Sequence, residues 1–188
     1  FTNKATMEII GIYKPYIYSA KFDGEELSEF SRLFSELMDI DDVWDFLNEH
    51  KEDFNRYLFQ FFDSTFEAAE QVSDEAKEML SYFDELSENT REDMQPDFDS
   101  YFKNLDGIYK CEINYIPVKG YGSKYRPTLI RLYAIKLKPN VYVIAAGGIK
   151  LRKKIQDSPG LKENVFRKID KVREYLSQFG ITDASDMD

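Results

Sequence analysis

Basic and tyrosine side chains alternate in the stretch from Lys119 to Lys154. A lysine or arginine can neutralise a phosphate group, and a tyrosine ring can stack on an unpaired base. This pattern predicts contact with an RNA backbone, although a solvated basic surface would have the same composition. The predicted RNA-binding residues are Lys119, Lys124, Tyr125, Arg126 and Arg152.

The charge of the chain is divided by position. Residues 1–106 hold 9 Lys and Arg against 27 Asp and Glu, a balance of −18, whereas residues 107–182 hold 16 against 5, a balance of +11. Aspartates in the tail bring the total to −10. The division suggests a phosphate-binding module that the acidic half covers as an electrostatic decoy, and a simply solvated acidic surface is the alternative.

The counts of histidine and cysteine argue against several kinds of chemistry. His50 and Cys111 are the single residues of their types, so the chain can form neither an internal disulfide nor a Cys/His zinc site. We therefore expect no cofactor and no metal ion.

The longest apolar run, from Val141 to Ile149, is too short to span a bilayer. These observations favour a cytoplasmic protein without membrane contact.

The acidic half opens with two runs of β-branched and aromatic residues, at 7–13 and 16–22. Lys14-Pro15 separates them, which predicts a β-hairpin. Residues 1–6 precede the first methionine, Met7, and are expected to be a tag or processing remnant. Helical spacing of apolar residues follows the hairpin. The expected helix starts are Asp23, Asp41 or Asp42, Ser64 and Ser73, and residues 87–102 read as a connector.

The basic half has the pattern of a small β-sheet followed by a helix. Strands are expected at 108–116, 128–137 and 141–146, with a loop at 117–127 between the first two. Ser158-Pro159 is expected to start the final helix. The inner face of that helix should comprise Leu161, Val165, Ile169, Val172, Leu176 and Phe179.

The second and third of these strands resemble the C-terminal signature of RelE/HigB-type toxins, a superfamily that includes phage-derived Gp49-like proteins. Arg131 and Tyr133 lie on one strand, and an aliphatic strand ending at Gly148 follows it. The lysines that match the pattern after the glycine are Lys150, Lys153 and Lys154. The resemblance is confined to the C-terminal half.

This resemblance implies a metal-independent endoribonuclease of a toxin–antitoxin or phage-associated system. The implied partners are mRNA or the ribosome and a cognate antitoxin, and no DNA contact is expected for this chain alone. In such chemistry the ribose 2′-OH attacks the adjacent phosphorus, and a lysine can act as base if burial or neighbouring cations lower its pKa. The alternative is a catalytically inactive protein- or RNA-binding module of the same fold. The implied catalytic residues are Arg131, Tyr133, Lys150, Lys153 and Lys154.

The predicted fold class is α+β, with a helical N-terminal half packed on a small, mostly antiparallel C-terminal β-sheet with a final α-helix. An acidic, mainly helical region that opens with a β-hairpin is expected at 7–106. A basic RelE/HigB-like module of sheet plus helix is expected at 107–182, and an acidic tail at 183–188.

Overall fold

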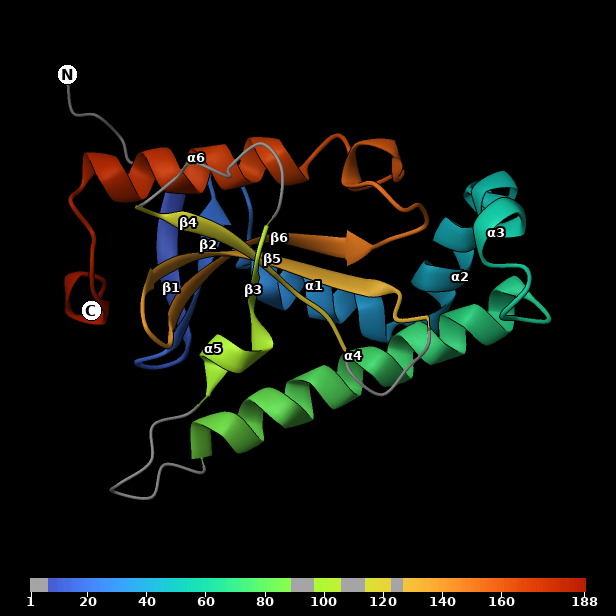
Figure 1. The fold of residues 1–188 in the computed structure, drawn as a ribbon, viewed down its shortest axis with the longest axis horizontal. Helices are drawn as coiled ribbons and strands as arrows, with labels where there is room; N and C mark the ends of the chain where they lie inside the picture. The colour runs from blue at the N-terminus through green and yellow to red at the C-terminus, as the bar shows by residue number, and fades with distance from the viewer. Residues whose placement is uncertain (1–6, 89–96, 106–113, 123–126) are drawn as a thin grey trace.

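A single mixed β-sheet crosses the protein, with helices on both of its faces (Figure 1). The computed structural model describes residues 7–88, 97–105, 114–122 and 127–188. The strand order is β1-β2-β6-β5-β4-β3; β2 and β6 are parallel, and the other neighbouring pairs are antiparallel. The strands are β1 (Met7–Tyr13), β2 (Ile17–Phe22), β3 (Lys103–Asn104), β4 (Ile116–Gly120), β5 (Ile130–Lys138) and β6 (Val141–Ile149).

The sheet corrects the predicted architecture. The expected hairpin is present as β1 and β2, but it belongs to the same sheet as the C-terminal strands, because Ile17 pairs with Tyr142 and Ser19 with Ile144. The prediction of a small sheet built from the C-terminal half was therefore wrong, and the α+β fold has one six-stranded mixed sheet. Alternating apolar residues identify a strand but do not specify which strand will be its neighbour.

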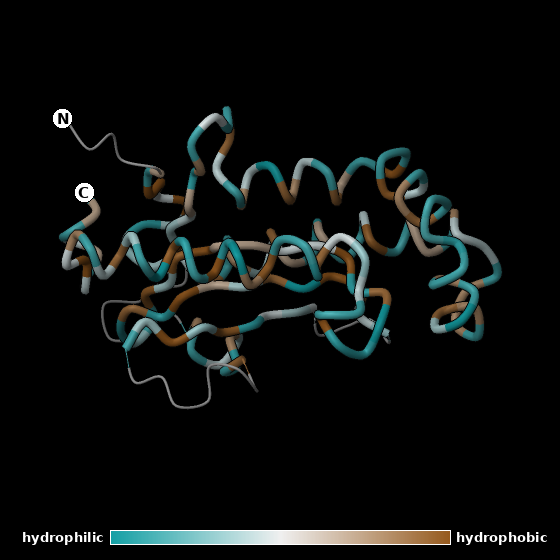
Figure 2. Tube along the Cα trace, turned by 90° about the horizontal axis from the view of Figure 1, so that it is seen from above, coloured by the Kyte–Doolittle hydropathy of each residue, from teal (hydrophilic) through white to brown (hydrophobic). Residues whose placement is uncertain are grey.

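The helices divide between the two faces of the sheet. Leu132 and Ala134 of β5 pack in the core with α1 and α4, whereas Tyr133 and Ile135 pack in the core with α6. Figure 2 shows hydrophobic residues concentrated along the strands between these helices. The helices are α1 (Glu29–Met38), α2 (Ile40–Glu49), α3 (Lys51–Tyr57), α4 (Thr65–Glu88), α5 (Phe98–Tyr101) and α6 (Val165–Gln178), with 3₁₀ turns η1 (Ile155–Asp157) and η2 (Ala184–Asp186).

Three helix starts in the acidic half differ from the prediction. Helix α2 begins at Ile40 with Asp39 as its N-cap, just before the predicted Asp41 or Asp42. The N-cap of α1 is Ser28, whose Oγ accepts a backbone N–H three residues later, so Asp23 precedes the helix. Helix α4 continues through Ser73, which is fully buried and donates its hydroxyl to the carbonyl oxygen of Met38 at 3.0 Å. A serine can serve as cap or as interhelical donor, and tertiary packing decides which.

The basic half also departs from the expected boundaries. Strand β4 occupies the first part of the predicted 117–127 loop, and most of the predicted 108–116 strand lies outside the described residues. Ser158 does not cap α6: its Oγ accepts the backbone N–H of Leu151 at 2.9 Å, and α6 begins only at Val165. The predicted strand pair at 128–137 and 141–146 is confirmed by β5 and β6.

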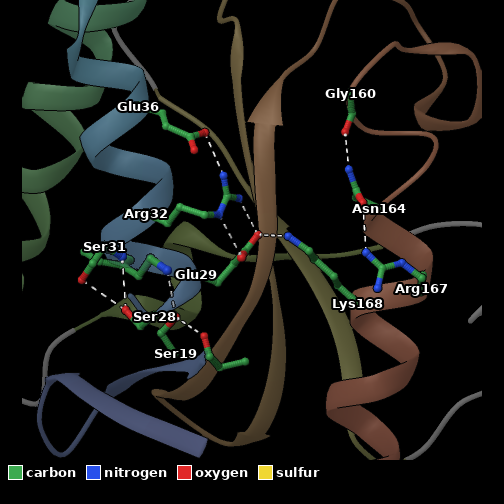
Figure 3. A network of polar contacts seen from close by, with 12 residues as sticks. Ser19, Ser28, Glu29, Ser31, Arg32, Glu36, Gly160, Asn164, Arg167 and Lys168 are labelled. Atoms are coloured by element: carbon green, nitrogen blue, oxygen red, sulfur yellow. Dashed lines mark hydrogen bonds and ion pairs between the residues drawn. The ribbon is translucent and has the colours of Figure 1, made fainter. Parts of the chain in front are cut away.

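An ion-pair network with a buried carboxylate at its centre joins α1 to α6 (Figure 3). The Glu29 side chain is 2% exposed, and its Oε1 lies 2.6 Å from Lys168 Nζ and 2.8 Å from Arg32 Nη2. The second nitrogen of the same guanidinium, Arg32 Nη1, lies 2.8 Å from Glu36 Oε2. The network thereby links the acidic N-terminal half to the final helix of the basic half.

Gly147 in β6 has no room for a side chain. A Cβ at this position would lie 2.3 Å from Leu33 Cδ2 and 2.9 Å from the backbone oxygen of Arg131. We expect Gly147→Ala to lower the free energy of unfolding by about 1–3 kcal/mol, because the neighbours must move. Urea denaturation measures this change. Gly11→Ala is the matched control, since the three atoms nearest to its Cβ all belong to the flexible Lys14 side chain. Equal losses in both variants would contradict the expectation.

Candidate functional site

A basic cavity of about 480 Å³ opens where β4, β5 and the segment after β6 meet. The sheet brings these segments together, because Lys119 of β4 pairs with Tyr133 of β5 and Arg131 of β5 pairs with Gly148 of β6. The cavity is lined by Leu105, Lys119, Tyr121, Arg131, Tyr133, Lys150, Lys153, Lys154, Ile155, Gln156 and Phe166.

The structure gathers all five predicted catalytic residues and one predicted RNA-binding residue, Lys119, around this cavity. Lys124, Tyr125 and Arg126 lie outside the described residues. Arg152 lies elsewhere: its Nε donates to Asp53 Oδ1 at 2.6 Å, and its guanidinium carbon is 5.5 Å from the centroid of the Tyr57 ring. Arg152 therefore packs against side chains of α3 and does not line the cavity.

Arg131 is held by contacts on one side of its guanidinium. Nη1 donates to the backbone oxygens of Thr128 at 3.0 Å and Ile130 at 2.9 Å, and to Thr128 Oγ1 at 3.2 Å. Its guanidinium carbon lies 5.0 Å from the centroid of the Tyr121 ring. Nε and Nη2 form no hydrogen bond with another described residue. An arginine arranged in this way can present its remaining N–H groups to an anion.

Lys150 has the electrostatic environment that a lysine needs in order to act as a general base. Burial lowers the pKa of Lys150, and the nearby charges of Arg131 and Lys119 lower it further. Its backbone N–H donates to the carbonyl oxygen of Leu129 at 2.8 Å, which fixes the start of the segment after β6. Within the described chain, Lys150 forms no ion pair. A lysine with a lowered pKa carries a larger neutral fraction and can accept a proton.

Tyr133 contributes a protonated hydroxyl. Its side chain is 1% exposed, and burial raises the pKa of the phenol, with the positive charge of Arg131 acting in the opposite direction. The hydroxyl therefore stays protonated at neutral pH and can donate a hydrogen bond. This role differs from that of Lys150, whose pKa moves toward neutrality.

Helices α1 to α5 contribute no residue to the lining of the basic cavity, whereas Leu105 of the acidic half does line it. Among the residues that the structure describes around it, none is Asp or Glu. Helices α1 and α4 pack on one face of the sheet, whereas the cavity includes Phe166 of α6 on the other face. The predicted electrostatic decoy is therefore not found in this part of the chain.

The sequence did not point to Glu75 of α4, whose carboxylate accepts hydrogen bonds from Thr128, Leu129 and Ile130 at the start of β5. Glu75 is 1% exposed, and burial raises the pKa of its carboxyl although three hydrogen bonds oppose that shift. A signal was present in the helical spacing, since Glu75 lies between the buried Val72 and Met79 on the inner stripe. A carboxylate on such a stripe requires a partner.

The lowered pKa of Lys150 predicts a pH dependence of stability. Between the folded pKa and the unfolded value of 10.5, the unfolded chain binds more protons, so the stability of the folded state rises with pH in this window. We expect Lys150→Met to abolish this rise, as measured by urea denaturation from pH 7 to pH 10.5. A parallel pH profile for the variant and the wild type would contradict the expectation.

Comparisons with protein-family models, curated proteins and solved structures returned no match for this chain. Within the described residues, no group of three or more His, Cys, Asp and Glu side chains is arranged to hold a metal ion. None of the helices in this part of the chain has both the length and the apolar composition needed to cross a membrane.

Proposed function

We propose that this protein binds RNA in the basic cavity and cleaves it as a metal-independent endoribonuclease, in the manner of the RelE/HigB-type toxins that its C-terminal half resembles. The observation that carries this proposal is the meeting of basic side chains from three separate segments. Lys119 comes from β4, Arg131 from β5 and Lys150 from the segment after β6. Such a cluster matches the charge of a phosphodiester.

The proposed reaction assigns each group a role that fits its environment. The neutral form of Lys150 accepts the proton of a ribose 2′-OH, whose oxygen then bonds to the adjacent phosphorus. The bond from phosphorus to the 5′-oxygen breaks, and that oxygen takes a proton from Lys153 or Lys154. Arg131 and the hydroxyl of Tyr133 donate to the phosphate oxygens, where negative charge increases. The products are a 2′,3′-cyclic phosphate and a 5′-hydroxyl.

The biological setting that follows from this proposal is a toxin–antitoxin or phage-associated system in the cytoplasm. The partners would be mRNA or the ribosome and a cognate antitoxin. Growth arrest on induced expression, relieved by Arg131→Ala or Lys150→Ala, supports this setting. Normal growth at a verified level of folded protein contradicts it.

A defined RNA substrate tests the reaction directly. The purified protein is incubated in EDTA with a single-stranded RNA and with its 2′-O-methyl counterpart, and the ends of the products are analysed. We expect a 2′,3′-cyclic phosphate from the first substrate and no cleavage of the second, because the attacking hydroxyl is blocked. Absence of both cleavage and binding would overturn the proposal.

One observation favours the alternative of a catalytically inactive RNA- or protein-binding module. The Nη1 group of Arg131 is already engaged by three oxygen atoms of the protein, which suits a static binding site. Under this alternative both oligonucleotides bind with similar affinity and neither is cleaved. The same experiment therefore separates the two functions.

A further inference from the structure

Glu75 holds the start of β5 through three consecutive residues. Its Oε1 accepts from Thr128 Oγ1 at 2.7 Å and from the backbone N–H of Ile130 at 3.2 Å, and its Oε2 accepts from the backbone N–H of Leu129 at 3.0 Å. One turn earlier on α4, Gln71 Nε2 donates to the backbone oxygen of Pro127 at 2.9 Å. Helix α4 thus anchors a continuous segment that leads into the basic cavity.

The anchored segment in turn holds the two central cations of that cavity. Arg131 Nη1 donates to both oxygens of Thr128, and the backbone N–H of Lys150 donates to the oxygen of Leu129 at 2.8 Å. Displacement of residues 128–130 would therefore move the guanidinium of Arg131 and the backbone of Lys150 together. This connection runs from the helical half of the chain to the cavity.

We propose that Glu75 is a positioning residue for the basic cavity: through Thr128 it fixes the guanidinium of Arg131 in the orientation that presents Nε and Nη2 to a phosphate. The consequence for RNA rests on the proposed function, whereas the orientation of Arg131 does not. In this arrangement the acidic half organises the cavity with one buried carboxylate.

The chemistry of the hydroxyl explains why this position needs a carboxylate. Thr128 Oγ1 has one proton, which it donates to Glu75, so its lone pairs remain for Arg131. An ionised carboxylate can only accept hydrogen bonds, so the Thr128 hydroxyl must point its proton toward Glu75. The amide of Glu75→Gln places an NH₂ group against Thr128 or against one of the backbone N–H groups, so at least one of these hydrogen bonds is lost.

The orientation of Arg131 is tested without RNA, by NMR of the ¹⁵N-labelled full chain, with the guanidinium signal assigned by its loss in Arg131→Lys. We expect the Nη1 protons to exchange with water at least tenfold faster in Glu75→Gln and in Thr128→Val than in the wild type. Thr128→Ser keeps the hydroxyl and should retain slow exchange. Wild-type exchange in both disruptive variants would overturn the inference.

Two controls separate positioning from general loosening of the fold. Ser73→Ala removes a buried hydroxyl from the same helix, but this hydroxyl donates to Met38 and not to the 128–130 segment, so slow exchange of Arg131 should persist. Thr128→Val keeps the experiment decisive if Glu75→Gln fails to fold. Faster exchange of Arg131 in Ser73→Ala, equal to that in Thr128→Val, would count against a specific path.

RNA binding supplies the functional measurement, with a 2′-O-methyl single-stranded oligonucleotide as probe over a range of salt concentrations. Loss of one phosphate contact should lower the slope of log K against log salt by about 0.7 in Thr128→Val and Glu75→Gln, with no change in Thr128→Ser. Full affinity and an unchanged slope in both disruptive variants would contradict the inference. If the wild type binds no RNA, the proposed function fails, while the NMR result still decides the role of Glu75.

Discussion

Lys150→Met is expected to slow RNA cleavage by about 10²–10⁴-fold, which is the usual contribution of a general base. Methionine keeps most of the length and the apolar character of the lysine stem but cannot accept a proton. The single-turnover rate of the wild type should rise with pH until Lys150 is neutral and then level off, because burial and neighbouring cations lower its pKa. The variant should lack this rise.

A lysine of the basic half that lies outside the cavity provides the control for this result. Lys162 is half exposed and forms an ion pair with Glu163 at 3.5 Å, so Lys162→Met should cleave RNA at the wild-type rate. Arg131→Gln should lose about 10²–10³-fold, as expected when a charged donor to the reacting group is removed. Wild-type rates in Lys150→Met would end the assignment of Lys150 as base.

Glu29→Ala is expected to lower the free energy of unfolding by about 3–5 kcal/mol, because it leaves the ammonium of Lys168 without its partner in a buried setting. The Lys168 side chain is 15% exposed and cannot regain full hydration without moving. Glu36→Ala is the matched control on the same helix. Its side chain is 55% exposed, so loss of its pair with Arg32 should cost about 1 kcal/mol or less.

A double replacement separates the charge effect from a packing effect. Glu29→Met combined with Lys168→Met removes both buried charges and should recover most of the stability lost in Glu29→Ala, since an apolar pair needs no desolvated partner. Urea denaturation at constant pH and salt measures all three variants. A double variant as unstable as Glu29→Ala would show that the loss arises from packing around α1.

Much of the basic cavity was predictable from the sequence because its residues lie at fixed positions of a strand pair. In β5, Arg131 and Tyr133 are two residues apart and therefore on one face of the sheet. The glycines at the end of β6 mark the point where Lys150 leaves the strand. Arg152 could not be assigned in this way, since beyond a strand end the direction of a side chain depends on packing, and here Asp53 of α3 pairs with it.

The sheet order and the role of Glu75 could not be predicted from local pattern. Parallel pairing of β2 with β6 joins Ile17 to Tyr142, which lie far apart in the sequence, and short-range alternation contains no information on such a pairing. Glu75 resembles the many solvated glutamates of the acidic half, and only its position on an inner helical stripe distinguishes it. The partners that give Glu75 its structural role are backbone N–H groups more than 50 residues away in the chain.

The pairing of β2, in the first hairpin, with β6 has a consequence for synthesis of the chain. Strand β6 lies inside the sheet between β2 and β5, and it leaves the ribosome after nearly every other element. Contacts between distant parts of a chain form late, so the sheet of the nascent polypeptide stays unfinished until residues 141–149 have left the ribosome. The basic cavity, whose lining includes Lys150 directly after β6, therefore cannot be complete before that strand has been synthesised.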